Sequence, residues 1–552
     1  MIKIKNSFIL VLTIALTLVI SCKDLDQMNI NPNGVDPAKA DPNLLMPTII
    51  TGVAQSVVSL GYGDLAGVMQ HTQYDGWSGG HNDYDWDNTG QSWGGYYDIL
   101  RNNKEFYNKA VAADLTFHQG VALVMKAYTF GLITDLWGDA PYSAALNAEE
   151  GGEANFKPVF DSQRDIYLGI LADLETANEL LSNDQNTYLG IISTQDVLYS
   201  GNAMKWRKFA NSLALRYYMR ISSKEEAMSI AGIKKIYDDP VTYPIITTSD
   251  DDASVAYIGK SPSDSWPNNT VFDKSTSGGY MRTKMCSTLV ETLKSLSDPR
   301  LAVWANKVEL PLVLEPTWAD NKDEIIDGKR HVAQNIVTAY ENTTHTPVNY
   351  ATDYIGIPPS LATASVYNLN PNLEQGVYNP HCSQLNNIYK EASGSLLKSR
   401  LMSAAEVNFI LAEAAQKGWI SESAQTLYNA GVQQSLNAWG IGSSYTAYIA
   451  NAPYAGLTEI IQQKWIASWT AAAEAWFDYR RTGLPALETG ETAKRAVLPL
   501  RFYYHYDSEI ALNPVNAQAA IDALESTSYT SPDSKNSAWS KSWLIQGTNK
   551  PW

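Results

Sequence analysis

The sequence predicts a mostly helical protein in which pairs of helices stack like tetratricopeptide repeats and support long irregular loops, with few short strands. Apolar residues recur at helical spacing from end to end, whereas the alternation typical of strands appears only in short pieces. The spacing between helix pairs is irregular, so no regular repeat period fits the chain. Polar stretches rich in aromatic residues separate the expected helices at 71–91, 240–283 and 340–395.

The expected helices follow from the apolar spacing, in order along the chain. The earlier ones are expected at 42–60, 92–113, 117–136, 161–182, 194–222 and 284–297. In the segment 402–418, apolar residues recur at i, i+3, i+4 and i+7, and Gly418 is a typical stop. These apolar residues are Val407, Ile410, Leu411 and Ala414. A further helix is expected from Ser421 to Trp439.

The last long pattern predicts one aromatic core helix within 457–485. Its apolar residues keep to one side of a continuous helix, which Gly483 and Pro485 end. They are Ile461, Trp465, Trp469, Ala472, Trp476 and Tyr479. We therefore expect this segment to run unbroken through the interior.

The beginning of the chain is typical of an export signal that is cleaved before a cysteine. An apolar run at 8–20 follows two lysines and ends beside Cys22, and it is shorter than the roughly 17 to 25 residues of a membrane-spanning helix. The tetrapeptide at 19–22 resembles a bacterial lipobox, in which the cysteine thiol is acylated. We expect a signal peptide at 1–21 and a single domain at 22–552, lipid-anchored at Cys22. The alternative is an ordinary secreted protein in which this cysteine is incidental.

The composition is that of a globular protein with a sizeable core. Hydrophobic residues make up 45% of the chain and charged residues only 18%. A linker rich in proline, glycine or serine is not found, which favours one large body. The formal net charge is −17, without clusters of lysine and arginine, and this excludes nucleic acid as a partner.

Cysteine and histidine usage supports neither a disulfide framework nor a zinc site. Apart from Cys22, the cysteines are Cys286 and Cys382, which either pair or stay as free buried thiols. The seven histidines are scattered, without HExxH spacing or a neighbouring CxxC. We therefore expect no metal cofactor of this kind.

Several separated blocks of sequence resemble the SusD/RagB family of Bacteroidetes outer-membrane lipoproteins. They are YTFGLITDLWGDAPY at 128–142, FKPVFDSQRDIY at 156–167, MSAAEVNFILAEAAQKG at 402–418, AWFDYRRTG at 475–483 and VLPLRFYYHYDSEIALNP at 497–514. Their order and spacing behind a lipobox carry the resemblance. The acidic stretch CKDLDQ, which starts at Cys22, resembles the surface-export signal of such lipoproteins, so we expect the cell exterior.

The resemblance implies a SusD-like scaffold of helix pairs and a role in polysaccharide utilisation. Such a protein captures glycan at the cell surface without catalysis and hands it to a SusC-like TonB-dependent barrel, on which it sits as a lid. Peptide cargo for the same lid is an alternative, because aromatic and acidic loops suit both. An exported hydrolase that uses Ser78 or a carboxylate pair is a third interpretation.

Many residues of the recurring blocks are expected to be structural. They fall at helix ends or turns, where such residues cap helices and form buried ion pairs. They are Trp137, Gly138, Pro141, Trp476, Asp478, Arg480 and Arg481. Glu406 and Glu413 share one helical face and imitate an acid/base pair, but we expect both to be hydrogen-bonded inside a helix pair.

A short motif in the first loop imitates a hydrolase. The segment 76–80 satisfies G-x-S-x-G and is followed by His81. A nucleophile elbow needs a buried strand before the serine and a helix after it. The residues around Ser78 instead indicate a helix tail followed by a polar loop, so we expect no catalysis here.

Alternating aspartates in the same loop imitate the start of a calcium-binding EF-hand. Asp83, Asp85 and Asp87 have the required spacing, but Asn88 and Gly94 stand where a glycine and a glutamate are needed. An EF-hand is therefore excluded. A less regular Ca²⁺ site, or hydrogen bonds from these carboxylates to sugar hydroxyls, are the alternatives.

The first loop is much richer in aromatic residues than the rest of the chain, and we predict that it binds ligand. Sugars stack their C–H faces on aromatic rings, while amides and carboxylates bind their hydroxyls. The predicted ligand-binding residues are Trp77, Asn82, Asp83, Tyr84 and Trp86, with Trp86 as the stacking platform. A weaker second site is predicted at Trp266 with Asp264 and Asn268.

Overall fold

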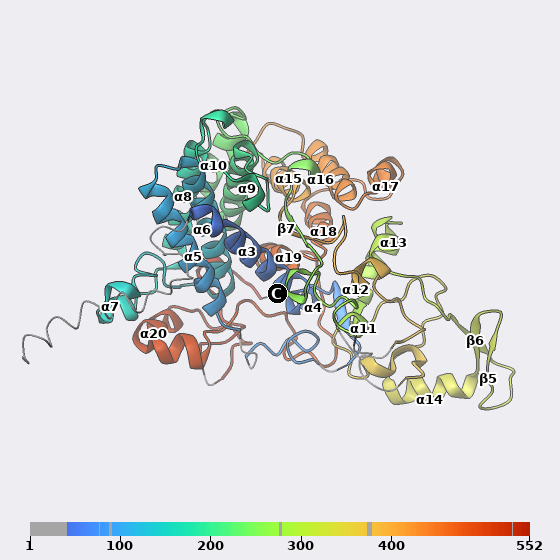
Figure 1. Cartoon of the computed structure of the whole chain (residues 1–552). Coiled ribbons are helices and arrows are strands. Elements are labelled where there is room, and N and C mark those ends of the chain that lie inside the picture. Colours follow the sequence, from blue (N-terminus) through green and yellow to red (C-terminus); the bar gives the residue numbers. More distant parts are fainter. Residues whose placement is uncertain are drawn as a thin grey trace, which may run out of the picture.

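The computed structural model describes most of the chain from residue 41 onward. The described residues are 41–76, 78–87, 91–274, 279–372, 378–532 and 534–551. The expected signal peptide, Cys22 and Trp77 therefore lie outside the described residues. Most helices gather in the upper half of the ribbon, and irregular loops gather along its lower side (Figure 1).

Helices from the N-terminal half form one side of the body. They are α3 (Met46–Gly61), α5 (Gly94–Ala112), α6 (Thr116–Trp137), α8 (Gln163–Leu180), α9 (Ala203–Ile221) and α10 (Glu226–Asp238). From α5 through α6, α8 and α9 to α10, each packs against the next, which confirms the prediction of stacked helix pairs. Asn202 caps α9 by accepting a bond from the backbone N–H of Lys205, so this helix begins later than predicted.

Helices from the C-terminal half form the other side (Figure 1). They are α15 (Ala404–Gln416), α16 (Ala424–Ala438), α17 (Tyr445–Ile449), α18 (Leu457–Ala467) and α19 (Ala472–Thr482). Ser403 caps α15, and Ser423 caps α16, through hydrogen bonds to backbone N–H groups of the first turn. α15 packs against α16 and α18, while α19 lies against α3 and α4 (Asp64–Val68).

The single helix predicted within 457–485 is wrong, because the structure breaks it into α18 and α19. Between them Thr470 adopts a left-handed backbone conformation, with φ 70°. α3 comes close to this break, and a Cβ added at Gly61 would lie 2.7 Å from the Cα of Ala471. Tertiary packing therefore overrides a helical pattern that continues through the sequence.

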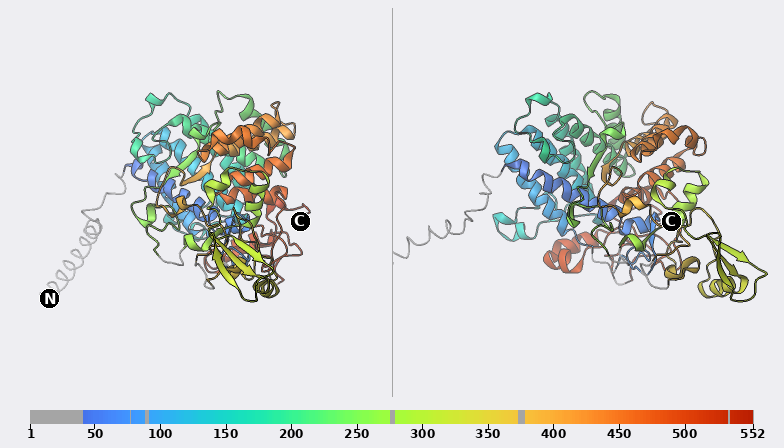
Figure 2. Two further views of the ribbon diagram at one scale, coloured as in Figure 1. Left: turned by 90° about the vertical axis from the view of Figure 1, so that its right-hand side faces the viewer. Right: turned by 45° about the vertical axis from the view of Figure 1, so that its right-hand side comes forward.

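The strands are short and form small sheets, as predicted. β1 (Thr72–Tyr74) pairs antiparallel with β3 (Thr283–Met285), and β2 (Ala253–Ala256) pairs antiparallel with β7 (Lys398–Met402). The third sheet has the order β4–β6–β5, from β4 (Leu312–Glu315), β5 (Asp323–Ile326) and β6 (Lys329–Ala333). This sheet and α14 (Gln334–Thr344) stand out from the body (Figure 2).

The structure also contains helices that the sequence pattern did not predict. The longest of them are α10, α14 and α20 (Pro514–Asp522). The helix predicted at 284–297 is shorter, as α12 (Ser287–Ser295), because the residues before it pair as β3. Strand pairing with β1 removes these residues from the helix.

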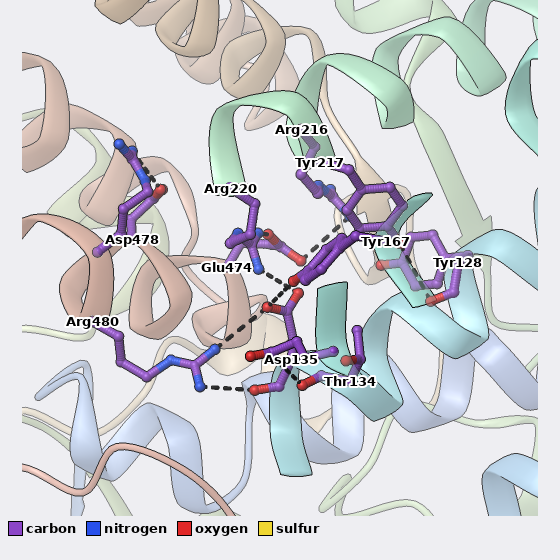
Figure 3. Close-up of polar contacts among 12 residues, drawn as sticks. Tyr128, Thr134, Asp135, Tyr167, Arg216, Tyr217, Arg220, Glu474, Asp478 and Arg480 are labelled. Atoms are coloured by element: carbon purple, nitrogen blue, oxygen red, sulfur yellow. Dashed lines mark hydrogen bonds and ion pairs between the residues drawn. The ribbon is translucent and has the colours of Figure 1, made fainter. Parts of the chain in front are cut away.

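A network of buried charges joins the two groups of helices (Figure 3). Arg220 of α9 donates to Asp135 of α6 and to Glu474 of α19, both at 2.5 Å. Arg216, one turn earlier, forms a bidentate pair with Glu406 of α15, with both N–O distances 2.7 Å. Buried charges need such pairing, because removing one partner leaves an uncompensated charge. The network therefore fixes α6, α9, α15 and α19 relative to one another.

The arginines of the AWFDYRRTG block are structural, as predicted. Arg480 donates to the backbone carbonyl of Asp135 at 2.7 Å. Arg481 forms a bidentate pair with Glu413 at 2.5 and 2.7 Å. Glu406 and Glu413 thus bind different arginines, and their structural role is confirmed. The remaining residues expected to be structural, Trp137, Gly138, Pro141, Trp476 and Asp478, are all buried.

The two cysteines of the described chain are free thiols. Cys286 and Cys382 are both buried and unpaired. Burial raises the pKa of each thiol to about 12, so both stay protonated and unreactive at neutral pH.

Candidate ligand-binding site

Trp86, the predicted stacking platform, lies in the core. The residue is 0% exposed, and its ring meets those of Trp476 and Phe502 edge to face at 5.2 and 5.0 Å. The indole N–H donates to the carbonyl of Gly80 at 3.0 Å. Both the ring and its polar atom are satisfied inside the protein, so the prediction of a solvent-facing platform is wrong.

The residues predicted to support this platform hold the loop together instead. Tyr84 is fully buried. The side chain of Asn82 accepts a bond from the backbone N–H of Tyr74 at 3.0 Å and donates to the carbonyls of Tyr74 and Gly76, both at 2.9 Å. Trp77 lies outside the described residues, so its ligand contact stays a prediction.

The second predicted site, around Trp266, is also occupied by internal contacts. Trp266 is 1% exposed, and its ring packs edge to face on Tyr62 at 5.1 Å. The carboxylate of Asp264 accepts from the backbone N–H of Ser261 at 2.7 Å and caps a short turn. Asn268 is half-buried, with φ 62°. The prediction is wrong for Trp266, because its ring is not available to a ligand.

The first two of the alternating aspartates attach the loop to a distant segment. Asp83 accepts a hydrogen bond from the hydroxyl of Thr492 at 2.6 Å. Asp85 forms an ion pair with Lys494 at 3.2 Å. These contacts hold the loop against the chain that follows α19.

Asp87, the third aspartate, binds the C-terminal segment. Its carboxylate accepts from the backbone N–H of Ala538 at 2.7 Å and from the hydroxyl of Ser537 at 3.2 Å. The three carboxylates thus have separate protein partners. In the part of the chain that the structure describes, no group of three His, Cys, Asp or Glu side chains could hold a metal ion.

Ser78 is not paired with a catalytic base. The ring Nε2 of His81 hydrogen-bonds with the hydroxyl of Thr72 at 3.2 Å, and the ring stacks on Tyr74 with centroids 3.8 Å apart. Burial lowers the pKa of His81 to about 3. The hydroxyl of Ser78 accepts from the backbone N–H of His81 at 3.4 Å rather than from its imidazole. The G-x-S-x-G segment is therefore not a nucleophile elbow.

A cavity of about 200 Å³, here called the Asp64 cavity, lies beside this loop. It is formed by the end of α3, the start of α4, the start of α5 and the end of α6. Its lining residues are Ser59, Leu60, Asp64, Leu65, Gln91, Ser92, Tyr96, Trp137 and Phe502. A Cβ at Gly80 would lie 2.7 Å from a carboxylate oxygen of Asp64, so glycine is what allows the loop to approach so closely.

Polar groups on the wall of the Asp64 cavity lack protein partners. Among the described residues, the carboxylate of Asp64 has no hydrogen bond or ion pair, and burial raises its pKa. The amide nitrogen and oxygen of Gln91 are buried and have no partner there either. Buried groups without a partner, such as the amide of Gln91, are rare in folded proteins and indicate a place for water or ligand. Tyr96 adds aromatic surface, so the cavity suits a ligand with both hydroxyl and C–H groups.

The family of the chain follows from its match to a known family model. The model described as "Starch-binding associating with outer membrane" matches residues 34–312 and 337–505. The chain belongs to this SusD-like family. SusD-like proteins are binding proteins rather than enzymes, which confirms the non-catalytic interpretation. No curated relative matches the sequence.

Solved SusD-like structures share the fold over 91 to 92% of the chain. A chitin-binding protein superposes with a TM-score of 0.68 at 22% identity, covering 91% of this chain and 99% of its own. A SusD homologue from Bacteroides fragilis gives 0.65 at 22% identity, with coverages of 92% and 99%. A chitin-binding SusD homologue from Flavobacterium johnsoniae gives 0.66 at 19% identity, with coverages of 91% and 99%. At these identities the likeness shows a common fold.

Besides residues 1–33, two parts of this SusD-like chain lie outside the family match. The unmatched stretch 313–336 contains nearly all of the protruding β4–β6–β5 sheet (Figure 2). The second part begins at residue 506 and includes the segment that binds Asp87. The segment that holds the loop beside the Asp64 cavity therefore lies outside the family match.

Proposed function

We propose that this SusD-like protein captures an oligosaccharide or polysaccharide at the cell surface and delivers it to a SusC-like TonB-dependent transporter of the outer membrane. Family membership carries the proposal, because the matching model is described as starch-binding and associated with the outer membrane. Two structural neighbours described as chitin-binding agree with a glycan cargo. The protein acts as a lid that binds cargo and releases it to the barrel.

The Asp64 cavity is the proposed contact for one sugar unit of this cargo. The carboxylate of Asp64 and the amide of Gln91 are unpartnered in the described chain and offer hydrogen bonds to hydroxyl groups. The ring of Tyr96 offers an apolar face to the C–H groups of a pyranose. This recognition needs no charge on the sugar, in keeping with an acidic protein of net charge −17.

Binding of a polysaccharide panel by the soluble chain from residue 23 onward tests the function. Asp64→Asn and Gln91→Leu should each weaken glycan binding about tenfold in calorimetry, with little change in melting temperature. Asp98→Asn is the matched control, since this exposed carboxylate of α5 pairs only with exposed Arg101 in the described chain. If the protein binds peptides and no glycan, the cargo is peptide instead. If both variants bind glycan as tightly as the unmodified chain, the Asp64 cavity is not the binding site.

Membrane attachment through Cys22 is the proposed basis of the outer-membrane location. Lipid chains on this cysteine bury apolar surface in the bilayer, so Cys22→Ser should release the protein from membranes. Retention of Cys22→Ser on membranes of a strain that lacks the transporter would contradict the lipid anchor. Affinity purification from the native host should recover a TonB-dependent barrel, and its absence would count against the lid role.

A further inference from the structure

We propose a second ligand site, independent of the glycan site, between α5, α6 and α8. This α5–α6 cavity has a volume of about 280 Å³ and shares no lining residue with the Asp64 cavity. Much of its wall is apolar, with Leu100, Leu123 and Phe130 among the lining residues, and the rings of Tyr107 and Tyr142 complete it. A cavity with apolar walls and a few polar groups is the usual form of a small-molecule site. We infer that it takes a small hydroxylated aromatic acid.

Asn103 supplies a buried acceptor at the wall of the α5–α6 cavity. The residue is 4% exposed, and its amide nitrogen donates to the carbonyl of Ala122 at 2.9 Å. Because a carbonyl only accepts, the nitrogen must face Ala122, which fixes the position of the amide oxygen. That Oδ1 atom is buried and has no partner among the described residues. A ligand hydroxyl that donates to Oδ1 would satisfy it.

Two lysines bring positive charge to the same cavity. Lys126 pairs with Asp173 at 2.9 Å and lies 5.3 Å from the ring centroid of Tyr142. The ammonium of Lys104 donates to two neutral oxygens, the carbonyl of Leu146 at 2.7 Å and Oδ1 of Asn147 at 2.9 Å. Its carboxylate partner, Glu149, is 3.7 Å away and 79% exposed, so water screens this ion pair. The cavity wall therefore has two ammonium groups, those of Lys104 and Lys126, and one close carboxylate, that of Asp173. This local excess of positive charge favours an anionic group on the ligand.

The three features together define the chemical class of the ligand. The apolar walls suit a planar aromatic ring, Oδ1 of Asn103 suits a hydroxyl on that ring, and Lys104, which lacks a close carboxylate, suits a carboxylate on the ligand. The simplest molecule with all three groups is 4-hydroxybenzoate, and a volume of about 280 Å³ accommodates it.

Three related probes separate the two polar contacts in calorimetric titrations of the mature chain. They are 4-hydroxybenzoate, benzoate, which lacks the hydroxyl, and 4-hydroxybenzyl alcohol, which lacks the carboxylate. The first should bind about tenfold more tightly than either analogue, because each analogue loses one contact. Asn103→Leu should abolish the preference over benzoate, and Lys104→Met should abolish the preference over the alcohol. Asp64→Asn, in the other cavity, should change neither preference.

A cavity-filling variant keeps the test decisive if Asn103→Leu folds poorly. Ala145 lines the cavity, and Ala145→Met fills it without removing a side-chain hydrogen bond, so it should block all three probes. The proposal is overturned if no probe binds at millimolar concentration, or if Ala145→Met binds them as the unmodified chain does. A crystal soaked in 4-hydroxybenzoate that shows only a water at Oδ1 of Asn103 would also overturn it.

Discussion

The hydroxyl of Thr492 donates a 2.6 Å hydrogen bond to the carboxylate of Asp83, although the two residues are 409 positions apart in the sequence. The backbone N–H of Lys494 donates to the carbonyl of Asp83 at 2.7 Å, and its ammonium group pairs with Asp85. The loop beside the Asp64 cavity is thus held at two successive acidic residues. Its conformation depends on contacts outside the loop itself.

Removal of the Thr492 hydroxyl should loosen this loop. Thr492→Val keeps the shape of the side chain but loses the bond to Asp83, at a cost of about 1 kcal/mol in the free energy of unfolding. Hydrogen exchange of residues 78–87, followed by mass spectrometry, should become faster. Thr343→Val on exposed α14, whose hydroxyl bonds only within its own helix, is the control. Equal exchange in both variants would contradict the loop attachment.

Truncation of Trp86 should destabilise the protein rather than damage a binding surface. Trp86→Ala removes a fully buried ring from the cluster with Trp476 and Phe502, and should lower the free energy of unfolding by about 3 to 5 kcal/mol. Urea denaturation measures this loss. Tyr506→Ala, at a residue that is 71% exposed, should change stability by less than about 0.5 kcal/mol. If Trp86→Ala kept its stability but lost glycan binding, Trp86 would be a stacking platform for the ligand after all.

Breaking the buried ion-pair network should be far more harmful than breaking a surface pair. Arg220→Met leaves Asp135 and Glu474 short of a partner in the interior and should cost about 3 to 5 kcal/mol in denaturant unfolding. Arg101→Met breaks the exposed pair with Asp98 and should cost about 0 to 1 kcal/mol. Similar losses in the two variants would show that the network does not hold the helices together.

Asp252 should make the free energy of unfolding depend on pH. Burial raises the pKa of this carboxyl to about 7, and the nearby charge of Asp251 raises it further. The hydrogen bond from the backbone N–H of Ala404 and the positive charges of Arg400 and Lys398 lower the pKa, but by less than burial raises it. The folded state therefore holds the proton more tightly than the unfolded state, whose pKa is near 3.8. This contribution to stability is complete at low pH and is lost as pH rises from about 4 to about 7.

Asp252→Asn tests this sign directly. The variant keeps an acceptor for the backbone N–H of Ala404 but carries no charge, so its advantage over the unmodified chain should grow with pH. It should reach roughly 2 to 4 kcal/mol above pH 7 and then level off. Urea denaturation between pH 4 and 8 provides the measurement. Stability curves that stay parallel over this range would contradict the raised pKa.

The helical scaffold was predictable because its signal is local. The apolar residues of 402–418 repeat at helical spacing, and Ser403 and Gly418 mark the two ends of α15. The break at Thr470 was not predictable in this way, because it depends on the close approach of α3, which is far away in the sequence. Local patterns therefore identify most helices but not where packing interrupts them.

The candidate site was less predictable, because burial is decided by distant partners. Aromatic density correctly marked the loop as unusual, but it does not tell whether a ring such as Trp86 faces solvent or the core. Asp64 is a single acid at the start of a helix, where acids are common, so nothing in the pattern marks it. Only the fold brings Asp64 and Gln91 to one cavity.

The hydrogen bond from the backbone N–H of Ala538 to Asp87 spans 451 positions of the chain and sets an order for assembly. With the signal peptide expected at 1–21, the chain crosses the membrane from its N-terminal end, so Asp87 emerges long before Ala538. The helices can pair during translocation, while the loop beside the cavity lacks its hydrogen bond to Ala538 until translocation is nearly complete. Under the proposed function, ligand capture is therefore the last property that the protein acquires, and a chain that ends before Ala538 should form its helices but bind glycan weakly.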